Sequence, residues 1–88
     1  MKESSFIITE FLSASKPVNH QGASIQMKER ASSALIFPIH GKLKFSWGSE
    51  VIFADPGHPV FIYEEMSYTN TCIEDAQSIM FNVKVQNS

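Results

Sequence analysis

Two consecutive stretches decide the fold class of this chain: GKLKFSWG (Gly41–Gly48) and VIFADPGHPVFI (Val51–Ile62). The first alternates apolar and polar residues, which is the pattern of a strand with one buried face. A Gly-Ser step separates the two stretches, and a Pro-Gly step divides the second one. Both steps are turn signals. Short alternating runs joined by such turns predict an all-β domain with antiparallel strands.

Apolar residues alternate on both sides of a His-Gly step, and this pattern predicts a hairpin with one buried face. The two apolar triplets are Leu35, Phe37 and Ile39, then Leu43, Phe45 and Trp47. We expect the chain to turn at His40-Gly41 between them. Pro38 falls on the opposite face, which favours an edge strand or a β-bulge because proline cannot donate to a ladder.

The remaining sequence also favours strands. We expect them over residues 25–29, 51–54, 60–63, 68–73 and 79–85, with a loop over 13–23 and a turn at Glu74-Asp75. The 60–63 run is nearly all apolar, as in a strand covered on both faces. Residues 4–12 combine helical spacing with a β-branched run, and we favour a strand or an extended arm. The total is about seven or eight strands in a sandwich or barrel.

Length and composition indicate one small domain. The 88 residues divide into an N-terminal arm or strand plus loop (1–23) and a β-barrel (24–88), and 43% of them are hydrophobic, enough for a core. Charged residues reach only 18%, against about 25% in typical domains. A surface with so little charge predicts that part of it is covered, by a twin subunit or by sequence outside this chain. We therefore expect a homodimer.

Charge and cysteine usage exclude several classes. The net charge is −2 and Lys and Arg do not cluster, so the basic surface that binds nucleic acid is absent. Cys72 is the single cysteine, which excludes an internal disulfide and favours a reduced, cytoplasmic location. No apolar run approaches the ~20 residues of a membrane-spanning helix, and the N-terminus lacks a signal peptide's basic start. We expect no membrane partner.

The segment from about Met27 to Val85 resembles the cupin family, in the version that forms the effector-sensing domain of AraC-type transcriptional regulators. The supporting residues are a strand that ends at Gly41, a short hairpin, and Pro56-Gly57 at the family's spacing. The resemblance covers roughly two thirds of the chain. It implies a small antiparallel β-barrel, the double-stranded β-helix or cupin-like jelly roll.

The resemblance also implies where a metal would bind. Metal-dependent cupins carry two histidines and a carboxylate before the first glycine, and a distal histidine further on. Here these positions fall on Lys28, Arg30 and Ala34, with Tyr68 near the distal one. Two cations, an alanine and a lone tyrosine do not make a metal set. We therefore expect no cofactor, no metal and no metal-dependent enzyme activity.

The three histidines do not replace these lost ligands. His20, His40 and His58 are expected in a loop, at a hairpin tip and in a turn. Their spacing matches no metal motif. Surface or turn roles are the simpler interpretation.

The candidate ligand-binding residues are Arg30, Phe37, Phe45, Trp47, Tyr68 and Asn70. Trp47 lies near a strand end, where its ring would stack on a ligand at the barrel mouth. Tyr68 and Asn70 share a face with Cys72 and add polar groups. Arg30 either points inward to an anionic effector or is a solvated strand end. For Phe37 and Phe45 we favour the simpler interpretation that they fill the barrel core.

By resemblance, the chain is the effector-binding and dimerisation domain of an AraC-type regulator. Its effector would be a sugar or another small organic molecule, and the 1–23 segment would fold over it or dock elsewhere. DNA would be bound only through a domain absent from this chain. Two alternatives stay open. One is a β-domain with a solid core that binds a protein partner. The other is a small metal-free cupin enzyme that uses Tyr68, His58 or Arg30 as acid or base.

Overall fold

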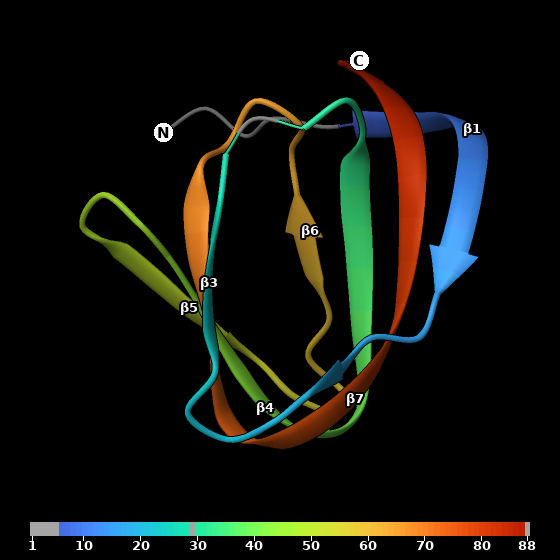
Figure 1. Cartoon of the computed structure of the whole chain (residues 1–88). Coiled ribbons are helices and arrows are strands. Elements are labelled where there is room, and N and C mark those ends of the chain that lie inside the picture. The colour runs from blue at the N-terminus through green and yellow to red at the C-terminus, as the bar shows by residue number, and fades with distance from the viewer. Residues whose placement is uncertain (1–5, 29, 88) are drawn as a thin grey trace.

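The chain is folded into one antiparallel sheet without helices in the part that its computed structural model describes, residues 6–28 and 30–87 (Figure 1). The strands are β1 (Phe6–Ser15), β2 (Val18–Asn19), β3 (Ser24–Met27), β4 (Ser33–Trp47), β5 (Glu50–Ala54), β6 (Val60–Ile62) and β7 (Tyr68–Asn87). The prediction of an all-β antiparallel domain is confirmed. Glu29 and the ends of the predicted arm and barrel, residues 1–5 and 88, lie outside the described residues.

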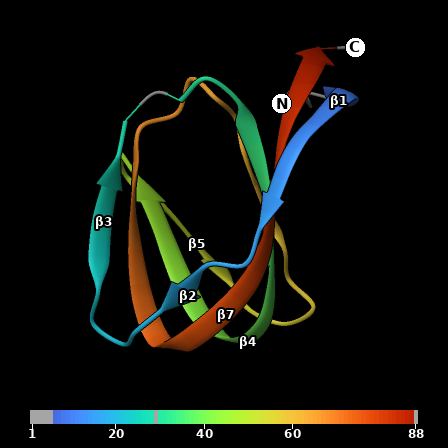
Figure 2. The ribbon, with the colours of Figure 1, turned by 45° about the vertical axis from the view of Figure 1, so that its right-hand side comes forward.

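Two long strands form the frame of the sheet. β7 is 20 residues long and pairs with β4 along one edge, and with β1, β2 and β3 in succession along the other. The free edge of β4 pairs first with β6 and then with β5. Both long strands curve strongly at mid-length, so the sheet folds back on itself (Figures 1 and 2). The fold encloses an interior between the two halves of one sheet.

The bend depends on one glycine. Gly41 has a φ of 85°, in the left-handed region, and the ladder between β4 and β7 is irregular from Pro38 to Leu43. A Cβ atom on Gly41 would lie 2.1 Å from the backbone oxygen of Asp75. Only glycine lets the two backbones approach this closely.

Both turns predicted at mid-strand are therefore wrong. The chain does not reverse at His40-Gly41 or at Glu74-Asp75, because β4 and β7 run through these positions. The glycine and polar residues that indicated turns instead form bulges, which bend a strand without ending it. The proline prediction is confirmed, since the first register shift follows Pro38.

The bulges also change which residues face the interior. In the first half of β4, Ala34, Ile36 and Pro38 are buried, whereas Phe37 and Ile39 are 40% and 48% exposed. Past the bulges, Leu43 and Phe45 point inward and are buried. The prediction that Phe37 shares a buried face with Phe45 is wrong, because the register shifts between them change the parity of the strand.

The short turns between strands lie where the local sequence predicts them. The turns at Gly48-Ser49 and Asp55-Pro56-Gly57 are confirmed, and Gly48 and Gly57 have φ values of 56° and 95°. The loop predicted over 13–23 is wrong in part, since β1 extends to Ser15 and β2 follows. Main-chain pairing with β7 holds both segments extended despite their polar composition.

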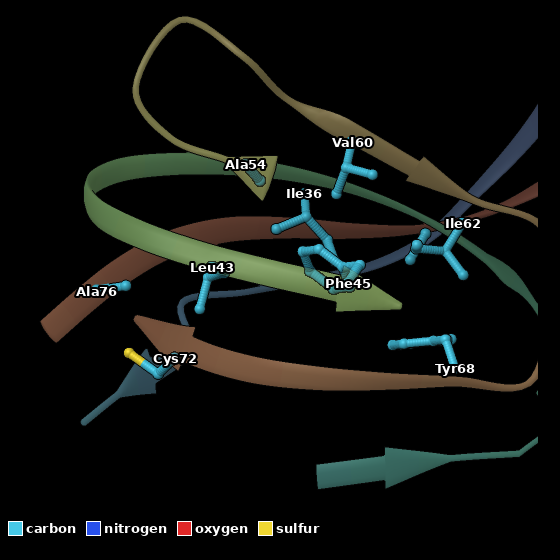
Figure 3. Close-up of a cluster of buried hydrophobic side chains, with 10 residues drawn as sticks. Ile36, Leu43, Phe45, Ala54, Val60, Ile62, Tyr68, Cys72 and Ala76 are labelled. Carbon is cyan, nitrogen blue, oxygen red and sulfur yellow. The ribbon is translucent and has the colours of Figure 1, made fainter. Parts of the chain in front are cut away.

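The core lies between the two halves of the folded sheet. It consists of buried residues from β4 to β7, and Figure 3 labels Ile36, Leu43, Phe45, Ala54, Val60, Ile62, Tyr68, Cys72 and Ala76. Within it, the rings of Phe45 on β4 and Tyr68 on β7 lie 5.7 Å apart. The described residues include no helix with the length and hydrophobicity needed to span a membrane.

Replacing Gly41 tests the bend. We expect Gly41→Ala to destabilise the protein by about 3 kcal/mol or more, because it combines a left-handed conformation with a backbone clash. Gly22→Ala is the matched control: Gly22 has a φ of 88° but open space around its Cβ position, so a loss of about 1–2 kcal/mol is expected. Urea unfolding measures both values. Equal losses would contradict the close approach.

Candidate ligand-binding site

A cavity of about 150 Å³ lies inside the folded sheet. Apolar side chains of β3, β4 and β7 form most of its wall, among them Met27, Ile36, Leu43 and Met80. Pro17 and Asn19 of the N-terminal segment close it on one side, and Arg30, Tyr68, Asn70 and Ser78 add polar groups. A concave, mostly apolar site with a few polar groups is typical of a small-molecule site.

Two polar atoms in this wall have no hydrogen-bond partner among the residues that the structure describes. They are Asn70 Oδ1 and Ser78 Oγ, and both are inaccessible to solvent. Ser78 is completely buried. An unpaired buried polar group costs about 1–3 kcal/mol, and native proteins contain few of them. A hydrogen-bond partner from outside the chain, such as a water or a ligand, would remove this cost if the side chains around the two atoms let it reach them.

Arg30 is held at the cavity by hydrogen bonds on both its backbone and its side chain. Its N–H donates to the Glu64 carbonyl at 2.9 Å, and its Nη2 donates to Asn82 Oδ1 at 2.8 Å. Asn82 Nδ2 in turn donates to Ser13 Oγ at 3.0 Å. A guanidinium that lines the cavity is thus connected to β1 through one amide side chain.

A larger and more polar groove lies next to the cavity. It has a volume of about 420 Å³, and its lining includes Lys28, Trp47 and Thr69. Met27 and Tyr68 line both the groove and the cavity, and they are directly paired between β3 and β7. This pair therefore separates the inner cavity from the outer groove.

The structure divides the six predicted site residues among four places. Arg30, Tyr68 and Asn70 line the cavity, and Trp47 lines the groove. Phe45 is fully buried in the core. Phe37 lies on the outer face of the sheet, where its ring contacts Phe81, so the interior position predicted for it is wrong.

Sequence reasoning missed Ser78, Asn19 and Pro17 as cavity residues. Ser78 lies on the inner face of β7 together with Met80 and Asn82, while the more apolar residues Ile79 and Phe81 lie on the other face. Around residues 78–82, hydrophobicity alone assigns the faces of this strand the wrong way round, whereas Val83 further along is buried as its hydrophobicity indicates. The available signal was the small residue at position 78, which leaves space that a larger side chain would fill.

The residues at the family's metal positions do not fit a metal ion. Lys28 and Arg30 are cations, Ala34 is part of the apolar core, and Tyr68 is a single weak ligand. Among the described residues, no three His, Cys, Asp or Glu side chains come together in a group that could hold a metal.

Other reactive groups lie outside the cavity. His58 Nδ1 is 2.6 Å from Asp55 Oδ1 on an exposed turn, and His20 and His40 are exposed. Burial raises the pKa of Cys72, whose Sγ donates to the Glu74 carbonyl at 3.0 Å. Its thiol stays protonated at neutral pH and is a poor nucleophile.

Comparison with known proteins places the fold. Neither a family model nor a curated protein sequence matches the chain. A protein of unknown function from Rhizobium leguminosarum has a TM-score of 0.75 at 18% identity, over 96% of this chain and 84% of that one. A cupin superfamily protein from Desulfitobacterium hafniense has a TM-score of 0.74 at 9% identity, over 93% and 78%. The chain has a cupin fold.

A third similar structure comes from a regulator. It is the cupin-2 domain of an XRE-family transcriptional regulator from Enterobacter cloacae, with a TM-score of 0.66 at 9% identity, over 90% of this chain and 95% of that domain. At these identities the likeness concerns the fold. The cupin fold that the resemblance implies is confirmed, and the regulator in this comparison is of the XRE family.

A comparison of two buried serines, Ser78 and Ser33, tests whether the Ser78 hydroxyl lacks a hydrogen-bond partner. We expect Ser78→Ala to leave the free energy of unfolding unchanged within about 0.5 kcal/mol or to raise it, because no protein partner is lost. Ser33 is equally buried, but its Oγ accepts a hydrogen bond from the Glu64 N–H at 3.1 Å. Ser33→Ala should therefore lose about 1–3 kcal/mol in urea unfolding. Equal losses at the two positions would show that Ser78 has a partner.

Proposed function

We propose that this chain is the effector-binding and dimerisation module of an AraC-type transcriptional regulator, with a metal-free cupin barrel that binds a small organic molecule. The observation that carries the proposal is the cavity with unpaired polar atoms of Asn70 and Ser78 in its wall. A ligand that supplies the missing hydrogen bonds gains affinity from groups that are unfavourable in the free protein.

The volume of the cavity suits this role. An apolar cavity of about 150 Å³ is large enough for benzene, so the space found here fits a small organic molecule. The alternative of a β-domain with a solid core is disfavoured by the same space. A metal-free enzyme is disfavoured because the described part of the cavity lining, which leaves out Glu29, includes neither a carboxylate nor a histidine as an acid–base pair.

Sensing requires that the ligand favour one conformation over another. The N-terminal segment is suited to respond, because Pro17 and Asn19 belong to the cavity wall. Ser13 is connected to the cavity through Asn82 and Arg30. In this proposal the ligand-bound cavity fixes the segment, and the change is passed in the cytoplasm to a DNA-binding region outside this chain.

Dimerisation is supported by an aromatic row on the outer face. Phe81 of β7 makes edge contacts with Phe11 of β1 and Phe37 of β4, at centroid distances of 5.9 and 6.0 Å. Phe11 and Phe37 are 64% and 40% exposed. Aromatic side chains gathered on an exposed sheet face are typical of an interface, and we assign a second copy of this chain as the partner.

A ligand screen by thermal shift tests the binding function. Sugars, fatty acids, bile acids and aromatic acids form the panel, and a ligand at a hundred times its Kd should stabilise the fold by ~2.7 kcal/mol. Trp47→Ala should reduce the shift, since Trp47 lines the groove that borders the cavity. Val51→Ala, an exposed change on β5, is the control. No shift with any compound would contradict the proposal, and so would a shift that Trp47→Ala and Val51→Ala reduce equally.

Charge on the aromatic row tests the dimer. We expect Phe37→Asp to convert a dimer into a monomer in sedimentation velocity, because a buried unpaired carboxylate opposes association. Phe53→Asp is the control, since Phe53 is 49% exposed but lies on β5. A monomeric wild type, or an equal effect of both substitutions, would rule out this interface.

A further inference from the structure

We propose that the cavity binds a small monocarboxylic acid, about the size of a hydroxybenzoate, whose carboxylate pairs with Arg30 and whose hydroxyl reaches Asn70 and Ser78. The inference rests on the proposed ligand-binding function and names the chemical class of the ligand. It follows from three properties of the cavity lining: the positive charge of Arg30, the unpaired polar atoms of Asn70 and Ser78, and the apolar side chains between them.

The charge of the wall selects an anion. Arg30 is the one formally charged side chain at neutral pH among the described residues that line the cavity. Its side chain is hydrogen-bonded to a neutral amide, that of Asn82, and no ion pair of Arg30 is found within the described ranges. A guanidinium keeps its charge at any physiological pH and matches the two oxygens of a carboxylate. One cation balances one negative charge, which favours a monoanion.

The unpaired atoms select a hydrogen-bond donor on the ligand. Asn70 Oδ1 only accepts hydrogen bonds, whereas the Ser78 hydroxyl both donates and accepts. A ligand hydroxyl donates to the first and accepts from the second. A site with buried polar groups discriminates strongly against a ligand that lacks the matching group, because those groups then stay unpaired.

The apolar walls select a compact hydrocarbon body between the two polar ends. Ile36, Leu43 and Met80 line the cavity, and they offer no partners for the several hydroxyls of a sugar. Burying such hydroxyls without hydrogen bonds is unfavourable. The wall therefore favours a hydroxy acid with an aromatic or short branched body over a sugar.

Binding of the acid also reaches the N-terminal strand. A carboxylate at Arg30 competes with the Asn82 oxygen for the guanidinium. The Asn82 amide donates to Ser13 of β1, so a shift of Asn82 changes how β1 is held. The ligand contact and the proposed response are thus joined by two hydrogen bonds.

Isothermal calorimetry on the full chain tests the class. The probes are 3-hydroxybenzoate, 4-hydroxybenzoate and mandelate, each with its neutral carboxamide, and benzoate as the acid without a hydroxyl. We expect at least one hydroxy acid to bind ~10-fold or more tightly than its carboxamide and than benzoate. Carboxamides that bind as tightly as the acids would overturn the proposal.

Variants locate the charge and the hydroxyl contact. Arg30→Gln should weaken the acid ~10-fold or more and leave its carboxamide nearly unchanged, with Arg30→Lys intermediate. Lys28→Gln removes a neighbouring cation that lines the groove and should change the acid affinity less than ~3-fold. Ser78→Ala should narrow the preference for the hydroxy acid over benzoate. If Arg30→Gln leaves the affinity for the acid unchanged, or Lys28→Gln lowers it equally, the carboxylate does not pair with Arg30.

The same measurements separate this inference from the proposed function. If only neutral compounds of the thermal-shift panel bind, the ligand-binding function stands and the carboxylic acid is wrong. If no compound of either panel binds, both are wrong. Wild-type circular dichroism and melting of each variant show whether a loss of binding reflects a loss of folding. If Arg30→Gln fails to fold, the acid-to-carboxamide ratio of the wild type decides alone.

Discussion

The close approach of two backbones at Gly41 and Asp75 is the constraint on which the rest of the structure depends. It allows β4 to bend against β7 without ending either strand. Because β7 carries the main ladders of four other strands, its curvature sets the position of nearly every element. Gly41 carries only a hydrogen atom where other residues carry a side chain, and this lets the two backbones meet. The interior between the two sheet halves, and so the cavity, depends on this contact.

Each face of the bent sheet has a feature that is unfavourable in an isolated domain: buried polar atoms inside and exposed aromatic rings outside. On the inner face, the side chains of Asn70 and Ser78 each have a buried polar atom with no partner within the described part of the chain. On the outer face, Phe11 and Phe37 are exposed to water. Each feature is unfavourable for an isolated, empty domain. Both become favourable if a small molecule fills the inside and a second copy covers the outside. A single account of ligand binding and association therefore explains two departures from a stable, self-contained core.

The sequence predicted those features that local chemistry decides. Gly48 and Gly57 mark true turns because a hairpin turn needs a positive φ, and Tyr68 and Asn70 face inward as their alternation with Thr69 indicates. It failed where a bulge and a turn share the same residues, at His40-Gly41. Period-two alternation separates the faces of a strand but does not say which one is inside once a bulge has changed the parity. This is why Phe37 was expected in the interior and Ser78 was overlooked.

The central claim is that the interior of the bent sheet is a binding site and not an accident of packing. The most direct measurement is a ¹H–¹⁵N spectrum of the labelled protein with saturating 4-hydroxybenzoate, with intermolecular cross-peaks recorded to side chains. The account predicts a shifted Asn70 side-chain amide and cross-peaks from the ligand ring to Ile36, Leu43 and Met80, which line the cavity. Contacts confined to exposed residues such as Phe11 and Phe53, with Asn70 unchanged, would contradict it.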